Sequence, residues 1–326
     1  MKKMAEFLTI GEPLVVLASQ DKDKSLNEAK IFEKFLAGAE LNVAVGISRL
    51  EHEVAYISKV GDDPFGNYII EAAIKSGIDV SHFKKDSKYL TGFYMKELVS
   101  SGDPEVAYFR KNSAASNFSS TEFKDINLNG VKLVHLSGIF PALSSTNLET
   151  FKVFNSQLNE ANILTVFDPN LRPALWESRK KMIEVTNELA RGSQIILPGI
   201  NEGEQLMGSR DPEKIADFYL NQSNLTHTVV VKLGADGAFL KTKDGKKIIV
   251  PGFKVKKVVD TVGAGDGFAV GLESALLEEW PIEDAVNRAC AVGALAVQSH
   301  GDSDGYPTKE ELIDFFNSDE HFGNCY

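Results

Sequence analysis

The sequence predicts an α/β fold built on a doubly wound, mostly parallel β-sheet flanked by helices. Short runs of β-branched and other apolar residues alternate with longer segments of helical spacing through most of the chain. The short runs are apolar throughout, which is typical of strands that are covered on both faces. Alternation of strands and helices in this order favours an open α/β sheet over a bundle or a sandwich.

The first part of the chain departs from this alternation. Residues 14–18 with 29–35, and then 92–99 with 106–111, are patterned as antiparallel strands with polar or Gly/Pro-containing connections. The simplest interpretation is a small β-sheet, inserted at about residues 12–37 and 89–115, that covers one end of the main sheet as a lid. No linker separates independent units, so residues 1–326 are expected to form a single domain.

The rest of the chain supplies the main sheet and its helices. The candidate strands are residues 131–136, 163–167, 194–197 and 228–233, and the candidate helices are residues 146–161, 178–191, 212–221, 266–279, 282–299 and 309–317. A hairpin is predicted between residues 238–242 and 246–250, because Asp244-Gly245 suits a turn that needs positive φ. Pro281 and Pro307 lie near two of the helix starts, where a missing N–H costs little.

Composition narrows the class of protein. The chain of 326 residues is long enough to bury a sizeable core, and its net charge of −11 argues against a nucleic-acid or anionic-membrane partner. Cys290 and Cys325 imply no disulfide framework, and the start of the chain has no apolar stretch typical of a signal peptide. No run approaches the ~20 apolar residues that span a bilayer. We therefore expect a cytoplasmic protein.

The strongest chemical signal is a glycine-rich turn, residues 260–266, that precedes an amphipathic helix. Glycines at 263, 265 and 267 permit a tight turn and a close approach to a ligand, and amides at a helix N-terminus attract an anion. Asp266 would repel a phosphate unless a hydroxyl lay between them. In that arrangement Asp266 accepts the hydroxyl proton while the amides hold the transferring phosphoryl oxygens. The alternative is that Asp266 only caps the helix. The spacing matches neither the Walker nor the dinucleotide-binding motif.

Residues 260–268 resemble the C-terminal signature of the ribokinase-like (PfkB) carbohydrate kinases. Four further segments resemble motifs of the same family in the same order: residues 38–44, 60–66, the Asn-x-x-Glu element 201–204, and 232–237. The resemblance extends from end to end of the chain, with Ala39 in place of a usual glycine. It implies a ribokinase-like fold in which ATP lies at the carboxyl ends of the strands and the lid closes over a sugar.

The resemblance also implies roles for individual residues. Asp266 would be the general base, and Gly263, Ala264 and Gly265 would donate amides to the phosphoryl group. Mg²⁺ would accompany ATP and contact Glu204 through water. The expected ATP-binding residues are Asn170, Arg172, Asn201, Lys232, Gly234, Gly237, Gly263 and Gly265.

Two arginines at predicted strand ends, Arg110 and Arg172, indicate an anionic sugar. Both strand ends are expected to face one cleft, and the arginine fork binds a carboxylate or phosphate with two hydrogen bonds. The alternative is that each arginine pairs with a local acid such as Asp168 or Glu97.

Within the family, the chain resembles the 2-keto-3-deoxygluconate kinases, through residues 11–15, 108–114, 135–144 and 300–305. This implies ATP-dependent formation of the 6-phosphate. The expected sugar-binding residues are Gly38, Ala39, Asn42, Tyr94, Tyr108, Arg110, Arg172, Asp266 and Asp302. The chain departs from the subgroup at Ala39, at Leu171, where tyrosine is usual, and at His300, where arginine is usual.

Two alternatives remain open. In the first, the substrate is fructose or another neutral sugar, since fructokinases share an arginine in the lid strand. In the second, the chain binds sugar or nucleotide as a regulator without turnover. An inert relative would be expected to lose the aspartate or glycines of the turn, and all are present. The six histidines form no metal-binding cluster, and His135 is expected to be a core residue. Family members often associate through the lid, so a homo-oligomer is expected.

Overall fold

The computed structural model describes residues 4–317, except 103, 124–125 and 300. Its centre is a nine-stranded sheet in the order β13-β12-β11-β10-β9-β8-β1-β4-β5. Strands β12 and β13 run antiparallel to their neighbours, and the others pair in parallel. The bounds are β1 Phe7–Ile10, β4 Val54–Gly61, β5 Phe83–Asp86, β8 Leu133–Ser137, β9 Leu164–Asp168, β10 Ile195–Ile196, β11 Thr228–Lys232, β12 Ala238–Thr242 and β13 Lys247–Val250. The predicted mostly parallel sheet is confirmed.

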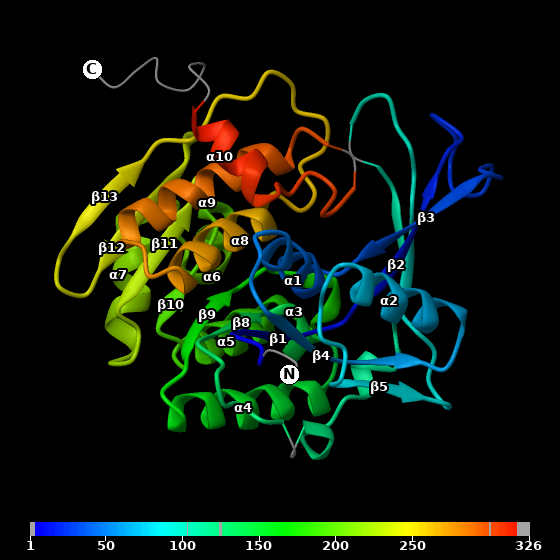
Figure 1. Cartoon of the computed structure of the whole chain (residues 1–326), viewed down its shortest axis with the longest axis horizontal. Coiled ribbons are helices and arrows are strands. Elements are labelled where there is room, and N and C mark those ends of the chain that lie inside the picture. The colour runs from blue at the N-terminus through cyan, green and yellow to red at the C-terminus, as the bar shows by residue number, and fades with distance from the viewer. Residues whose placement is uncertain (1–3, 103, 124–125, 300, 318–326) are drawn as a thin grey trace.

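Helices cover both faces of this sheet (Figure 1). One face packs on α1 Ala39–Arg49, α2 Pro64–Lys75, α8 Ala264–Leu277, α9 Ile282–Ala296 and α10 Lys309–Asn317. The other packs on α3 Ile139–Ala142, α4 Ser145–Glu160, α5 Arg179–Ala190, α6 Ile200–Met207 and α7 Pro212–Gln222. The sheet is therefore buried on both sides, which explains why most residues of its strands are apolar.

A second, four-stranded sheet extends to one side of the main body (Figure 1). We call it the lid; it consists of β2 Leu14–Ser19, β3 Phe32–Ala37, β6 Phe93–Lys96 and β7 Val106–Phe109, in the order β3-β2-β6-β7. The pairs β2–β3 and β6–β7 are antiparallel, as expected, while β2 and β6 pair in parallel. Only residues 11–13 separate β1 of the main sheet from β2 of the lid.

The crevice for a ligand follows from the strand order. After β1 the chain adds strands in one direction through β4 and β5, and later in the other through β8 to β11. Ligands of open α/β sheets bind outside the carboxyl ends of the strands where the order reverses, here between β1 and β8.

No helix in the described ranges is long and apolar enough to cross a bilayer.

Candidate active site

A cavity of about 330 Å³ lies at this switch point. Its walls come from the carboxyl ends of β1, β8, β9 and β11, from the first turn of α1, from the N-terminus of α8, and from the lid. All nine residues predicted to bind the sugar line this cavity: Gly38, Ala39, Asn42, Tyr94, Tyr108, Arg110, Arg172, Asp266 and Asp302. The fold thus brings together residues that are more than 200 positions apart in the chain.

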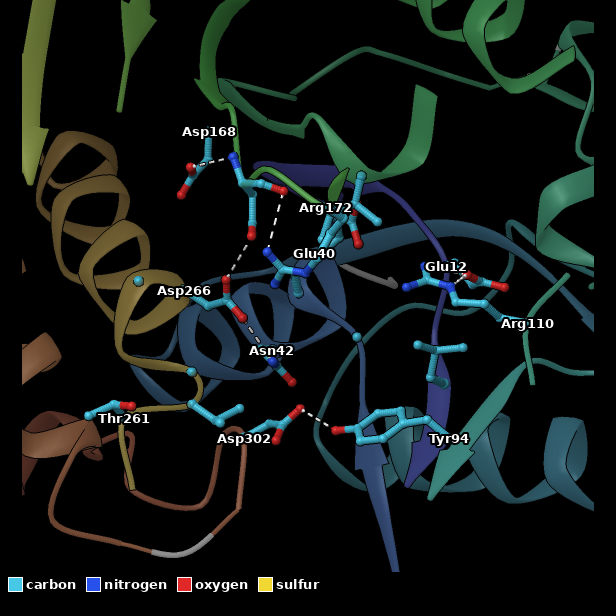
Figure 2. Close-up of a pocket in the computed structure, with 18 of the residues that line it drawn as sticks. Glu12, Glu40, Asn42, Tyr94, Arg110, Asp168, Arg172, Thr261, Asp266 and Asp302 are labelled. Carbon is cyan, nitrogen blue, oxygen red and sulfur yellow. Dashed lines mark hydrogen bonds and ion pairs between the residues drawn. The ribbon is translucent and has the colours of Figure 1, made fainter. Parts of the chain in front are cut away.

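Asp266 lies in the first turn of α8 and is held by two amide side chains (Figure 2). Its Oδ2 accepts a hydrogen bond of 2.9 Å from Asn42 on α1, and its Oδ1 one of 3.3 Å from Asn170 in the loop after β9. These contacts fix the carboxylate in one orientation without protonating it. The carboxylate remains in the cavity wall, where a hydroxyl group can reach it.

The environment of Asp266 suits proton transfer near neutral pH. Burial raises the pKa of Asp266 to about 6, against the opposing effect of the hydrogen bond from Asn42. The charges of Asp168 and Asp302 raise this pKa as well, and that of Arg172 lowers it. A general base is most effective when its pKa lies near the working pH, so this shift favours catalysis over simple helix capping.

One residue of the glycine turn has a left-handed backbone conformation that requires glycine. Gly263, the N-cap of α8, has φ 78° and ψ −8°. A Cβ at this position would overlap the backbone oxygen of Asp302, so both the backbone angles and the space require glycine. Within the described part of the chain, the amides of Gly263, Gly265 and Asp266 have no hydrogen-bond partner, and that of Ala264 makes one long contact of 3.4 Å to Thr261. These N–H groups are available to an anion.

Gly265 has a different reason to be glycine. A Cβ there would meet only Lys232 Nζ, at 3.9 Å, and Gly265 has no positive φ. The protein itself therefore leaves room for a side chain at this position. A ligand that approaches the backbone closely is the remaining explanation for a glycine in the first turn of a helix, where alanine is intrinsically better.

Lys232 and two acids form a buried charged group at the ends of β9 and β11. Lys232 Nζ donates to Asp168 Oδ2 at 2.6 Å; burial lowers the pKa of Lys232, but Asp168 and Glu202 together outweigh burial and raise it. Nearby Glu202 accepts the amides of Gly199, at 2.7 Å, and Leu171, at 2.8 Å. Burial raises the pKa of Glu202, while Lys232 opposes this effect. Three charges thus border the cavity beside the glycine turn.

Asn201 and Glu204 are predicted to contact ATP and Mg²⁺, but neither of them lines this cavity. Both lie on α6 and contact Arg210, whose Nη1 is 2.6 Å from Asn201 Oδ1 and 2.9 Å from Glu204 Oε2. The acid that α6 presents to the cavity is Glu202. A sequence signal for it exists: Glu202 stands three residues after the N-cap Gly199, the capping-box position, which directs the side chain back to the helix start.

The lid contributes aromatic rings and one paired arginine. Tyr94 Oη donates to Asp302 Oδ2 at 3.2 Å, and the rings of Tyr94 and Tyr108 lie 5.3 Å apart. The guanidinium of Arg110 pairs with Glu12, with an Nε–Oε2 distance of 2.7 Å (Figure 2). The side chain of Glu12 is fully buried, so most of the charge of Arg110 is already balanced. Its partner is thus neither Asp168 nor Glu97, the local acids that the sequence suggested.

Arg172 differs from Arg110. Its Nη1 donates to the backbone oxygens of Leu171, at 3.0 Å, and Asn170, at 3.5 Å, and it has no acidic partner among the described residues. It lies in the cavity wall close enough to Asp266 to lower the pKa of that carboxyl. Arg172 therefore supplies the cavity with a positive charge that forms no ion pair within the described part of the chain. His300, the third departure from the subgroup, lies outside the described residues.

Glu40 is the one cavity-lining acid that has no polar partner among the described residues. Its side chain is fully buried against Gly11, and neither carboxyl oxygen has a hydrogen bond. Burial raises the pKa of Glu40 to about 7. Behind it, His135 Nδ1 contacts Glu273 Oε1 at 2.7 Å; burial opposes protonation, but Glu273 raises the pKa of His135 to about 9. His135 is thus a paired core residue, as expected.

A second cavity, of about 320 Å³, lies on the other side of the glycine turn. Lys232 and Gly265 border both cavities, and the predicted residues Gly234, Gly237 and Ala264 line this second one. The other residues that line it are mostly apolar, and none of them was predicted to bind a ligand: Phe253, Val255, Val258, Phe268, Cys290, Ala294 and Val297.

The two cavities together fit a nucleoside triphosphate and a second, polar substrate. An apolar cavity accommodates a base, and the unpartnered amides of the turn between the cavities accommodate phosphate oxygens. Asp168 and Glu202 offer the oxygen ligands that Mg²⁺ prefers. No cluster of three or more His, Cys, Asp or Glu suited to a metal occurs among the described residues.

Comparisons with known proteins agree with this geometry. The model of the pfkB family carbohydrate kinases matches residues 4–309. The chain is 42% identical over 313 residues to the 2-dehydro-3-deoxygluconokinase of Bacillus subtilis (strain 168), covering 95% of each. The crystal structure of a PfkB protein from Polaromonas sp. JS666 superposes with a TM-score of 0.86, at 40% identity, covering 95% of this chain and 99% of that one.

A sugar kinase from Pyrococcus horikoshii, solved in complex with ATP, superposes with a TM-score of 0.81, at 29% identity, covering 96% of this chain and 98% of that one. The family model, which matches residues 4–309, spans every residue that lines the two cavities. The chain therefore belongs to the PfkB family of carbohydrate kinases, which are ATP-dependent phosphotransferases.

Proposed function

We propose that the chain transfers the γ-phosphoryl group of ATP to the 6-hydroxyl of 2-keto-3-deoxygluconate (2-dehydro-3-deoxygluconate), with Asp266 as general base. The observation that carries this proposal is the position of Asp266, which lines the sugar-side cavity one residue from amides that have no protein partner. A hydroxyl between the carboxylate and the turn can lose its proton as it attacks the phosphoryl group. The amides of Gly263, Ala264 and Gly265 would stabilise the charge that develops.

Two observations favour an acidic sugar over a neutral one. Arg172 places an unneutralised guanidinium in the sugar cavity, and guanidinium groups bind carboxylates with two parallel hydrogen bonds. The Bacillus subtilis relative, at 42% identity, is a kinase of such an acid. Arg110 adds less, because Glu12 already balances it; we assign it mainly to orienting the acid and to packing on Tyr108.

The second cavity is proposed to hold the adenine ring, and the glycine turn to hold the phosphates. Lys232, which borders both cavities, would contact the phosphate chain, as would Asn170. Mg²⁺ would supply charge neutralisation for the phosphate oxygens, with Glu202 and Asp168 rather than Glu204 as the nearest protein oxygens. Asn201 and Glu204 lie outside the cavity and carry no role in this proposal.

The test is a coupled ADP-release assay with 2-keto-3-deoxygluconate, fructose and ribose under identical conditions. The acid is expected to give the highest kcat/KM, and mass spectrometry of the product should show one added phosphoryl group at the 6-position. Far better turnover of fructose would refute the argument from Arg172. Absence of turnover with all three sugars, in a chain that binds ATP, would favour a regulatory binding protein instead.

A further inference from the structure

Two side chains of the lid strand β6 reach the main domain beside the glycine turn. Alternate residues of a strand point to the same face, and Tyr94 and Lys96 are such a pair. Tyr94 contacts Asp302, and Lys96 Nζ donates to Asp260 Oδ2 at 2.8 Å. The side chains of Lys96 and Asp260 are only 18% and 20% exposed, so solvent screens their attraction less than at an open surface.

The same carboxylate shapes the start of the glycine turn. Asp260 Oδ1 accepts the amide of Val262 at 3.0 Å, in the Asx-turn arrangement that folds a backbone back on itself. The turn then continues through Thr261, whose carbonyl faces the amide of Ala264, to Gly263. One carboxylate therefore joins a lid lysine on one oxygen to the backbone of the turn on the other.

Lys96 acts on the sugar side as well, through its charge. Burial raises the pKa of Asp302, and the ammonium of Lys96 is close enough to oppose that rise. The backbone oxygen of Asp302 is in turn packed against Gly263, so closely that no Cβ fits between them. Lys96 thus lies between two acids that both touch the glycine turn, while it lines neither cavity itself.

We propose that Lys96 is a positioning residue that couples the lid to the glycine turn. When a sugar holds the lid in place through Tyr94 and Asp302, Lys96 fixes Asp260, and Asp260 fixes the amides that receive the phosphoryl group. The inference rests on the proposed function and extends it: transfer geometry is complete only with the lid in place. Such coupling reduces transfer of the phosphoryl group to water when no sugar is bound.

The test compares Lys96→Met, which keeps the apolar stem and removes the charge, with Lys96→Arg, which keeps the charge. Three quantities are measured: kcat, the KM for 2-keto-3-deoxygluconate and for ATP, and the ratio of ATP hydrolysed without sugar to sugar phosphorylated. Lys96→Met is expected to lower kcat about tenfold, a modest transition-state effect, with both KM values within about threefold. It should also raise the hydrolysis ratio. Lys96→Arg should restore most of the turnover.

Lys34→Met is the matched control. Lys34 also joins the lid to the main domain, with its Nζ 3.8 Å from the ring centroid of Tyr68 on α2, but it lines neither cavity. It should leave kcat and the hydrolysis ratio unchanged. If Lys96→Met matched Lys34→Met in both, the coupling would be refuted while the kinase proposal stood; a wild-type chain inactive on every sugar would refute the kinase proposal itself.

A second variant guards against a folding defect in Lys96→Met. Asp260→Asn keeps an acceptor for the amide of Val262 but loses the ion pair with Lys96. It should reproduce the fall in kcat and the rise in the hydrolysis ratio, with a melting temperature close to that of the wild type. A normal hydrolysis ratio in this variant would also overturn the coupling.

Discussion

The two cavities that flank the glycine turn have similar volumes but are lined by different chemistry. The sugar-side cavity is bordered by six carboxylates, two arginines and two tyrosines, which come from the lid and from both halves of the main sheet. The second cavity is bordered mainly by glycines and apolar side chains from the C-terminal third of the chain. The first recognises a ligand through charged and hydrogen-bonding groups, and the second through shape and apolar contact.

This difference predicts which functions single substitutions can separate. On the sugar side the polar groups belong to separate side chains, so removal of one side chain should affect one property, either binding or transfer. Between the cavities the amides of the turn serve both ligands, so a change there should affect transfer while leaving each ligand bound. Five substitutions, from the largest expected effect to the smallest, test this division and the stability of the site.

The largest effect is expected for Asp266→Ala. Loss of a general base typically costs ~100-fold or more in kcat, and the KM for ATP should change little because the amides of the turn remain. Steady-state kinetics on sugar and ATP measure both. Asp62→Ala, which removes a surface acid facing Lys85, is the control and should be neutral. Comparable turnover of the Asp266 variant and the wild type would contradict the assignment.

A smaller effect, confined to the sugar side, is expected for Arg172→Ala. Loss of a charge-assisted contact should raise the KM for 2-keto-3-deoxygluconate about 10- to 100-fold, with little change for fructose or ATP. Arg110→Ala should also raise the KM for the acid more than for a neutral sugar, but less than Arg172→Ala does, because Glu12 already balances the charge of Arg110. Equal losses on acid and neutral sugars would show that neither arginine reads the carboxylate.

Gly265→Ala tests the wall between the cavities. Its Cβ fits the fold, and replacing glycine in a helix turn should stabilise the protein by roughly 0.5–1 kcal/mol. The methyl group should nevertheless hold the phosphoryl oxygens off the amides and lower kcat about tenfold or more. Thermal unfolding and kinetics on the same preparation check both signs. A variant that is more stable and fully active would mean that no ligand approaches this backbone.

The smallest effect concerns stability alone. The folded-state pKa of Glu40 is about 7, above the ordinary value of 4.5, so the folded protein binds an extra proton between these values. Stability should therefore fall as pH rises from 4.5 through 7. Glu40→Gln removes this dependence, so it should exceed the wild type by roughly 1–3 kcal/mol at pH 8 and by much less at pH 5. Urea unfolding of both proteins measures the difference; an equal gap at both pH values would contradict it.

Much of the fold could be predicted from the sequence because its signals are local. The helix predicted at 309–317 has the bounds of α10, and Asp244-Gly245 forms the turn between β12 and β13. Strand β10 has only two residues where four were predicted. The two flanking residues still make backbone hydrogen bonds to the neighbouring strands, from Thr228 N–H to Gln194 O and from Leu197 N–H to Phe167 O. The elements β1, α1, β4 and α2 are not predicted individually, because they lie close to the lid strands in the sequence and their apolar patterns are hard to separate from those of the lid.

The site could be predicted only where motif residues themselves face the cavity. Asp266 and the glycines lie in one short segment, so the sequence alone predicts that they lie close together. Glu12 was missed because its partner Arg110 is 98 positions away, and Glu40 because a buried acid with no partner has no sequence pattern. The motif spacing predicts Glu204 as the acid near Mg²⁺, whereas Glu202 lines the cavity. Spacing alone does not show which face of α6 meets the cavity.

The three-residue connection between β1 and β2 places a mechanical constraint on the enzyme. Any tilt of the lid relative to the main sheet must be absorbed at this crossing and at the three other connections, which are Gly38 and residues 87–92 and 110–114. Glu12 occupies the middle of the crossing and also anchors Arg110 at one of these connections. The segment about which the lid would turn and the residue that anchors Arg110 in the cavity wall therefore belong to the same short connection. A substitution there that changes the opening angle of the lid is expected to change the choice of sugar as well.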